Sequence, residues 1–259
     1  MKAIIQVDGK TIYISIRILS IALAMLIVLA GCAKQKEDSI EPQKQHNLKM
    51  SKENIGHQHN VYLDMLLADS ALGEITHFGL AEISRIIDSC ASYAIEDGHN
   101  LDSINSIRDA LVEMFTNDLV VDDDLFFVID SGALLEDYLV NSLNYSEAFG
   151  EKIRELHYLG KYYSDNLLDA IQNDFGAYDF GENENYVRDI FVCIADSSES
   201  YWRNYLDNGM KAGWGRTEWT YFNDALGGVW GFAFGGVGSV ICGAALSYVT
   251  EKHFEKLEN

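Results

Sequence analysis

The sequence predicts an all-α protein, a helical bundle of about five to seven helices that ends in a Gly-rich apolar helix or hairpin. Apolar residues recur every three or four positions in nearly every segment from residue 60 onward, and this spacing places one apolar stripe on each helix. Glycines separate the striped segments, and no series of alternating strands is found. A third observation is the run from Ala225 to Thr250, which has 26 residues and no charged side chain.

Four apolar stripes define the main helices that we expect. The shorter two cover residues 75–93 and 101–114, and the longer two cover residues 149–171 and 187–205. Asn60 and Asn100 stand where N-cap residues belong, just before apolar periodic segments. Residues 120–129 fit a loop and a helix start better than a strand. A single α-helical domain is therefore predicted for residues 55–259.

The first 31 residues have the features of a secretory signal peptide. Three cationic residues, Lys2, Lys10 and Arg17, precede the uncharged run from Ile18 to Leu29, and small residues follow that run. A cationic start, a short apolar run and a small-residue cleavage point together define such a peptide. Residues 1–31 are therefore not expected to be part of the folded domain.

The end of this peptide, Leu29-Ala30-Gly31-Cys32, resembles the lipobox of bacterial lipoproteins. The resemblance implies that a diacylglyceryl group is attached to the Cys32 thiol and that cleavage makes this residue the first of the mature protein. It also implies that the membrane is a partner through this lipid anchor.

A polar segment, residues 32–54, follows the lipobox and contains the only proline, Pro42. Its composition gives too little apolar surface to offset the entropy of ordering, so it is predicted to be a flexible tether. In lipoproteins a residue other than Asp after the cysteine, here Ala33, implies transport to the outer membrane. We therefore expect a lipid-anchored protein of the bacterial cell envelope, on the periplasmic or the surface face.

Without residues 1–31 the chain has 16 basic and 39 acidic residues and a formal net charge of −23. Nucleic acids and anionic lipid headgroups are bound by clusters of Lys and Arg. The acidic balance therefore argues against both as partners.

Three cysteines, Cys90, Cys193 and Cys242, remain when Cys32 is lipidated. An odd number outside the cytoplasm leaves at least one thiol unpaired. A disulfide between Cys90 and Cys193 is one possibility, because both lie on predicted helices. Three buried thiols are the other.

The most individual motif of the mature chain is Gly56-His57-Gln58-His59-Asn60-Val61-Tyr62-Leu63-Asp64. Two imidazoles, His57 and His59, are too few for a zinc site, which needs three or four ligands at defined spacing. We expect instead that Asn60 caps the following helix and that Leu63 enters the core. No metal site is predicted.

This motif also resembles the pattern G-x-x-H-N-x-x-L-D that occurs in a group of uncharacterised bacterial lipoproteins soon after the lipid cysteine. Gly56, His59, Asn60, Leu63 and Asp64 match that pattern, and residues 227–243 match the Gly-rich apolar stretch of the group. The resemblance implies no activity.

Other candidate sites lack the residues that their chemistry requires. Two acidic clusters, residues 122–124 and 174–184, do not have the spacing of an EF-hand loop. Gly236-Val237-Gly238-Ser239 approaches nucleotide-binding and nucleophile motifs but completes none of them. No catalytic residue and no cofactor are therefore predicted.

A ridge of small residues follows the apolar run, with one residue in every four: Gly227, Gly231, Gly235, Ser239 and Gly243. Such glycine zippers allow two helices to approach closely, in membranes or in protein cores. Three roles remain open for residues 225–250: a buried helix or hairpin, a segment that inserts into membranes or self-associates, and a permanent membrane span.

The function expected from these observations is that of an envelope-anchored module for binding or assembly, without catalysis. The alternative is a membrane-active, bacteriocin-like protein that inserts through the glycine zipper. A hydrolase with a dispersed active site is a third and weaker alternative.

Overall fold

A computed structural model describes residues 2–7, 10–15, 50–73, 75, 78–115, 132–162, 164–207 and 216–258. The chain divides into two compact units, Met1–His46 and Asn47–Asn259. Cys32, most of the predicted tether and the segment 120–129 with its three aspartates lie outside the described residues.

The first unit contains an antiparallel hairpin that the sequence analysis did not predict. Strand β1 (Lys2–Val7) pairs with strand β2 (Lys10–Ser15), and Val7 lies opposite Lys10. The dipeptide Asp8-Gly9 between two Ile-containing runs is a sequence signal for a two-residue hairpin loop. The hairpin lies within residues 1–31, which are predicted to be a signal peptide from their charge and their apolar run.

The described residues of the second unit are all-α, as predicted. Seven of its helices have 14 or more residues: α2 (Lys52–Ala68), α4 (Leu80–Glu96), α5 (Leu101–Met114), α8 (Glu147–Tyr162), α10 (Glu182–Asp207), α11 (Arg216–Gly231) and α12 (Gly235–Glu258). Shorter helical pieces connect them: α3 (Ser70–Gly73), α7 (Gly132–Asp137), η2 (Tyr138–Ser142), η3 (Ser164–Asn166), α9 (Leu167–Asp169), η4 (Ala170–Phe175) and η5 (Phe232–Phe234).

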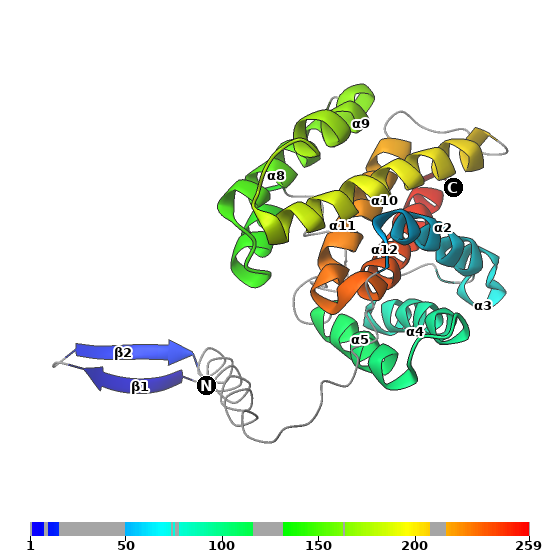
Figure 1. Ribbon diagram of the computed structural model, residues 1–259. Coiled ribbons are helices and arrows are strands. Elements are labelled where there is room, and N and C mark those ends of the chain that lie inside the picture. The colour runs from blue at the N-terminus through cyan, green and yellow to red at the C-terminus, as the bar shows by residue number, and fades with distance from the viewer. Residues whose placement is uncertain are drawn as a thin grey trace, which may run out of the picture. The chain divides into compact units, whose positions relative to one another are not determined.

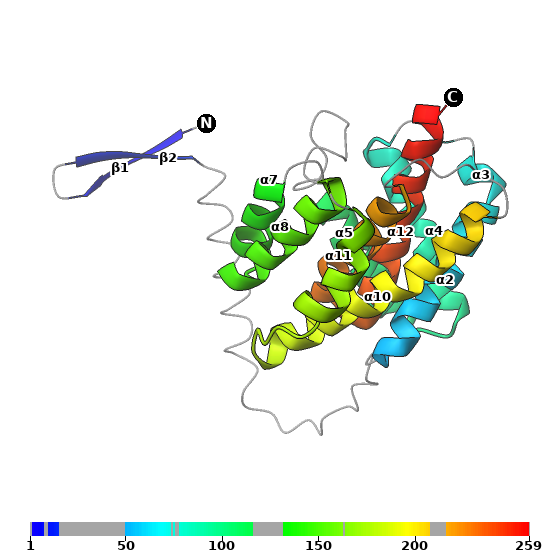
Figure 2. The same cartoon turned by 90° about the horizontal axis from the view of Figure 1, so that it is seen from above.

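The two C-terminal helices form the centre of this bundle (Figure 1). α12 packs against α11, α2, α4 and α5, while α11 packs against α10 and α8. A view from above shows the same order, with α7 and α8 on one side of the α11–α12 pair and α2 and α4 on the other (Figure 2). Helices from the earlier part of the chain thus pack around the two C-terminal helices.

The start of α2 corrects one prediction. The N-cap is Ser51, whose hydroxyl accepts a hydrogen bond from the Asn54 amide, and Asn60 lies in the middle of the helix. Asn100 does cap α5, because its side chain accepts from the Ser103 amide. α2 begins at Lys52, within the predicted tether 32–54, and Ile55, the first residue of the predicted domain, is completely buried and fixes the helix to the core.

The predicted stripe over residues 149–171 is interrupted rather than continuous. α8 ends at Tyr162, and the short pieces η3, α9 and η4 follow it. The residues at the break, Ser164, Asp165 and Asn166, have side chains that compete with the helix for backbone hydrogen bonds. The apolar residues Ile153, Leu156, Leu167 and Ile171 are all buried nevertheless.

Candidate functional site

The uncharged segment 225–250 folds into an antiparallel hairpin. α11 ends at Gly231, the turn η5 follows, and α12 starts at Gly235. Gly235 has φ +83°, a left-handed conformation that side chains disfavour, so a glycine at this position permits the reversal. In the structure the segment is therefore a helical hairpin packed within the bundle.

The two arms of this hairpin are short compared with a bilayer. Ala225–Phe234 has 10 uncharged residues and Gly235–Thr250 has 16. At 1.5 Å per residue these are about 15 Å and 24 Å of helix, whereas the hydrocarbon core of a membrane is about 30 Å thick. By length and composition alone, Arg216–Glu255 could cross a membrane, but 78% of its most apolar window is buried in the bundle.

Glycines let the two arms touch backbone to backbone. A Cβ atom on Gly227 would lie 2.8 Å from the Gly243 Cα, and one on Gly231 would overlap the carbonyl oxygen of Gly238. The ridge predicted for a continuous helix therefore takes a different form. Gly235 lies at the turn, Ser239 is buried on α12, and Gly238 takes the place opposite Gly231.

The lipoprotein-like motif on α2 forms one helix face, because its residues have spacings of three and four. A Cβ atom on Gly56 would overlap the Ser197 hydroxyl of α10. The Asn60 amide donates to the Ser197 carbonyl at 3.1 Å, and Asp64 accepts from the Tyr201 hydroxyl at 2.6 Å. The motif therefore packs α2 onto α10, and this spacing was the signal that the capping interpretation missed.

A cluster of buried polar side chains lies where α2, α10, α11 and α12 meet. We call it the polar centre; it consists of His59, Ser198, Trp202, Asn223, Asp224 and Ser247, all completely buried. Asp224 is its hub. Its Oδ2 accepts from the Ser198 hydroxyl and, at 2.9 Å, from the Trp202 indole, and it lies 4.0 Å from the His59 Nε2. Ser247 also lies near the carboxylate, outside hydrogen-bond geometry.

Hydrogen bonding fixes the proton on the His59 ring. The Asn60 Nδ2 is used by the Ser197 carbonyl, so the Asn60 Oδ1 faces the His59 Nδ1 at 2.9 Å and accepts its N–H. The Nε2 atom then points toward Asp224. The distance from Nε2 to the Asp224 Oδ2 is 4.0 Å, too long for a hydrogen bond.

The polar centre brings Ser, His and Asp together, yet the order of contacts is not that of a hydrolase. A nucleophilic serine needs its hydroxyl on the imidazole that will accept its proton. Here Ser198 donates to Asp224, which leaves His59 without contact to the hydroxyl. The buried polar atoms His59 Nε2, Asp224 Oδ1, Asn223 Oδ1 and Asn223 Nδ2 have no hydrogen-bond partner. The cluster therefore costs stability rather than supplying it.

We expect Asp224→Asn to stabilise the protein at pH 7. Burial raises the pKa of Asp224, although His59, Ser198, Ser247 and Trp202 act in the opposite direction. The folded state therefore binds the carboxyl proton more tightly than the unfolded chain. The stability from this group is complete below the ordinary carboxyl pKa of about 4 and is lost as pH rises through the folded-state pKa.

An asparagine keeps the acceptor for Ser198 and Trp202, adds a donor toward His59, and cannot ionise. Denaturant unfolding from pH 4 to pH 8 should show a flatter stability profile for Asp224→Asn than for the wild type. Asp224→Ala is the control, and it should cost roughly 2 kcal/mol or more, since it leaves two buried donors unpaired. An unchanged profile in Asp224→Asn would contradict a buried, titrating Asp224.

A second buried charge pair closes the base of the hairpin. The Arg216 guanidinium at the start of α11 contacts the Glu251 carboxylate on α12 at 2.5 Å, and their side chains are only 2% and 0% exposed. The Phe254 ring lies 5.6 Å from the same guanidinium. Burial raises the pKa of Glu251, while its hydrogen bond and charge interaction with Arg216 lower it. Glu251, the charged residue that directly follows the uncharged segment, is thus paired with Arg216 inside the bundle.

The remaining candidates are placed as follows. His57 is exposed and His59 is buried, so the two imidazoles do not converge on a common ion. In the described part of the chain, no group of three or more His, Cys, Asp or Glu is arranged to hold a metal. In the acidic cluster 174–184, Asp179 accepts from Gly181 and Asn185, and Glu184 accepts from Ser146, so these carboxylates serve local structure.

In the described part of the chain no disulfide joins Cys90, Cys193 or Cys242, so of the two possibilities above the disulfide between Cys90 and Cys193 is not formed. Cys193 lies on α10 beside Gly56 of α2. Cys90 on α4 lies in the core, where burial raises its pKa and Cys242 of α12 adds to that effect. Cys90 of α4 therefore lies near Cys242 of α12, whereas Cys193 of α10 lies beside α2.

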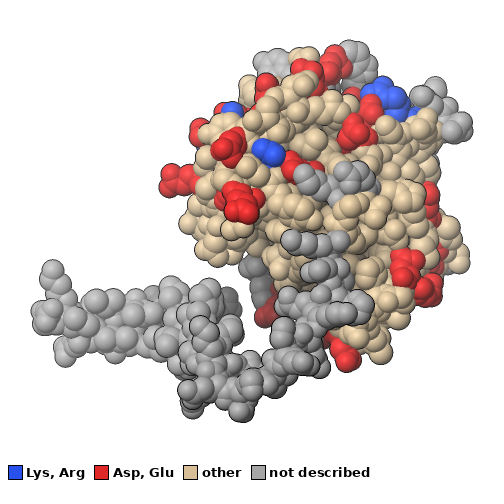
Figure 3. All heavy atoms as spheres, in the orientation of Figure 1, with Lys and Arg blue, Asp and Glu red and all other residues tan. Residues whose placement is uncertain are grey.

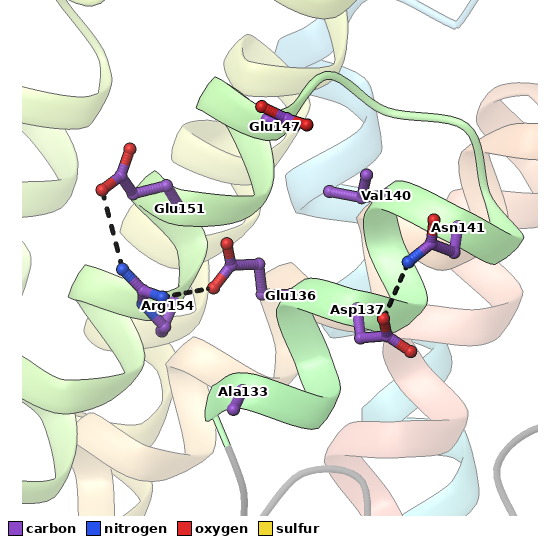
Figure 4. A pocket seen from close by; sticks show the side chains of 8 residues that line it. All are labelled: Ala133, Glu136, Asp137, Val140, Asn141, Glu147, Glu151 and Arg154. Carbon is purple, nitrogen blue, oxygen red and sulfur yellow. Dashed lines mark hydrogen bonds and ion pairs between the residues drawn. The ribbon is translucent and has the colours of Figure 1, made fainter.

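A hollow of about 460 Å³ lies on the surface between α7, η2 and α8 (Figure 4). It is acidic, and its single cation already bridges two carboxylates: Arg154 contacts Glu136 at 2.6 Å and Glu151 at 3.6 Å. Asp137 accepts from Asn141. Acidic side chains also outnumber basic ones on the visible face of the domain (Figure 3). The described surface therefore offers negative charge to a partner rather than positive charge.

Compared with protein-family models, with curated proteins and with solved structures, the chain matches none.

Proposed function

We propose that this chain is a lipid-anchored protein of the bacterial cell envelope whose helical domain serves binding or assembly, with the α11–α12 hairpin as its fixed core. The anchor rests on the resemblance of residues 29–32 to a lipobox. The observation that carries the role of the domain is the backbone contact between the two hairpin arms at Gly227–Gly243 and Gly231–Gly238. Because the two arms pack this closely, the apolar segment forms part of the folded core.

The polar features support the same proposal. The buried pairs Arg216–Glu251 and His59–Asp224 connect the hairpin to itself and to α2. Removing the hairpin from the bundle would separate His59 from Asp224 and expose the apolar faces of α2, α4 and α10. The surface that remains for a partner is acidic and polar, which suits a water-soluble, cationic partner better than an anionic one.

Thiol labelling tests whether the core stays fixed. The mature protein is treated with a hydrophilic maleimide, with and without phosphatidylcholine vesicles, and each cysteine is scored by peptide mass mapping. Cys193 is half-buried, while Cys90 and Cys242 are completely buried with their pKa values raised by burial, so both are slow nucleophiles. We expect labelling of Cys193 alone in both conditions.

Cys90 is the informative residue, because a hairpin that enters a membrane would shield Cys242 in lipid but uncover Cys90 on α4. Labelling of Cys90 on addition of vesicles would overturn the fixed-core proposal. The same peptide map tests the anchor, because the mature protein should begin at Cys32 with the mass of attached acyl chains.

A membrane-active protein is the second candidate, and one observation favours it. The turn of the hairpin carries Phe232 and Phe234, both half-buried, and Ala233, which is exposed. An apolar turn at the surface gives a hairpin a point from which to enter a bilayer. Release of dye from vesicles, lost when Gly231 is replaced by leucine, would support this candidate against the first.

A further inference from the structure

We propose that the hairpin tip, residues Phe232–Phe234, is a membrane-contact site that rests on the lipid surface in which Cys32 is anchored, while the bundle stays folded. The inference rests on the proposed function for the anchor itself and adds an orientation of the domain on its membrane. Two independent observations carry it: the composition of the turn, and the place where the predicted tether joins the bundle.

The composition of this turn is unusual for one that meets water. Surface turns are generally built from Gly, Asn, Asp, Ser and Pro, whose side chains are polar or absent. From Gly231 to Gly238 this chain has no polar side chain, and it places two aromatic rings in the turn. Ala233 is exposed, and Phe232 and Phe234 are half-buried. Phenylalanine side chains on an apolar surface bury into the boundary between headgroups and acyl chains.

The predicted tether joins the bundle beside the same tip. The Tyr186 hydroxyl on α10 donates to the Met50 carbonyl, the first described residue of the domain, at 3.3 Å. The ring of Tyr186 packs against that of Phe232, with centroids 5.5 Å apart. A single tyrosine side chain therefore spans from the end of the tether to the hairpin tip.

The length of the tether makes even a weak contact effective. Met50 is 18 residues from Cys32, and a flexible chain of that length has an end-to-end distance of about 24 Å. A domain held so close to its membrane has a high effective concentration at that surface, so the docking site needs little affinity of its own. The rest of the described surface is polar and acidic and gains nothing from contact with lipid. The apolar tip is therefore the part of the domain that turns toward the membrane.

Charges near the tip do not oppose this contact, because they are engaged within the protein. At the start of α10, Glu184 accepts from the Ser146 amide and hydroxyl, and Arg188 contacts Asp189 and the Tyr178 carbonyl. The contact is hydrophobic and does not depend on anionic headgroups. We expect it equally on zwitterionic lipid.

Depth-dependent fluorescence quenching tests the proposal on the full mature, lipidated protein in phosphatidylcholine vesicles. An environment-sensitive probe is attached at Ala233→Cys, with Cys193→Ser to remove the half-buried thiol. Ala68→Cys is the matched control, because Ala68 is also an exposed alanine and lies at the other end of α2, about 25 Å along the helix from the tether. Quenchers are attached to the lipid acyl chains.

We expect the probe at position 233 to be quenched at least threefold more strongly than the probe at position 68. Equal quenching at both positions, with protein that still floats with the vesicles, would overturn the docking proposal and leave the anchor intact. Protein that does not float would overturn the anchor instead. The two failures are therefore distinguishable.

A second measurement uses protein without a probe, so that the probe itself cannot cause the contact with lipid. Amide hydrogen exchange in residues 231–236 should slow on vesicles, and Ala233→Asp should abolish the slowing without changing the melting temperature in water, since Ala233 is exposed. Exchange in α4 should stay unchanged, because the bundle remains closed. Faster exchange in α4 would show that the hairpin leaves the bundle and would contradict docking in the folded state.

Discussion

Gly231→Ala is expected to destabilise the domain by about 3 kcal/mol or more, although it adds only one methyl group. A Cβ atom at this position would overlap the carbonyl group of Gly238 on the facing arm and crowd the Cys242 side chain. Backbone atoms cannot move aside by changing rotamer, so the two arms have to separate. Separation of the arms reduces the packing of the centre of the bundle, where many side chains lose contacts at once.

Chemical denaturation monitored by circular dichroism measures this effect, and Gly73→Ala is the matched control. A Cβ atom on Gly73 meets no atom within 4 Å, so this variant should stay within about 0.5 kcal/mol of the wild type. Gly227→Ala should also be strongly destabilising, because its Cβ would lie 2.8 Å from the Gly243 Cα. If Gly231→Ala and Gly73→Ala had the same stability, the close packing of the hairpin arms would be wrong.

Arg216→Met should cost about 3–5 kcal/mol at pH 7, the usual effect of leaving one member of a buried ion pair without its partner. The Glu251 side chain is completely buried, and its contact with Arg216 offsets part of the cost of that burial. Without the guanidinium, the largest effect that opposes burial is lost, so the pKa of Glu251 in the folded state rises further. The folded state then binds the proton more tightly than the unfolded chain.

The sign of the pH dependence follows from that difference. The contribution of Glu251 to the stability of Arg216→Met is complete at acidic pH and is lost as pH rises through the raised pKa. The defect should therefore shrink as pH falls toward the ordinary carboxyl value. The double variant Arg216→Met/Glu251→Leu should recover most of the loss at pH 7, because two apolar side chains replace the ion pair.

A surface pair provides the control for Arg216→Met. Arg203 contacts Glu199 one turn away on α10, and its side chain is 64% exposed. Arg203→Met should change stability by less than about 1 kcal/mol, because water solvates the exposed Arg203 guanidinium, although the Glu199 side chain is only 13% exposed. A similar loss in Arg203→Met and Arg216→Met would mean that the charge of Arg216 matters through solubility or net charge rather than through its burial with Glu251.

Periodicity in the sequence was sufficient to predict the class of fold. The stripes through Ile83 and Ile86, through Ile104 and Ile107, and through Ile190 and Ile194 are buried in the structure. Helical spacing is a local property, since residues three and four apart share a face whatever surrounds them. For the same reason the N-cap at Asn100 was predictable. Asn60 stands in an equally polar context, but the N-cap of α2 is Ser51.

Only the tertiary structure decided what the conspicuous motifs do. Gly56, His59, Asn60, Leu63 and Asp64 form one face of α2 against α10 and the polar centre, and that role depends on residues more than 130 positions away. In the sequence, Asp224 and Glu251 cannot be told from surface carboxylates. Their burial results from the pairing of α11 with α12, and a long-range contact of this kind leaves no local signal.

The sequence by itself thus determined the helices, the acidic charge and the uncharged segment 225–250, because composition and periodicity are properties of the chain alone. It left open whether that segment is a buried helix or hairpin, a segment that inserts into membranes or self-associates, or a permanent span. The structure selects a hairpin that turns at Gly235, whose arms meet at Gly227–Gly243 and Gly231–Gly238. That choice depends on how closely two backbones can approach within a bundle, which only the packing of distant residues decides.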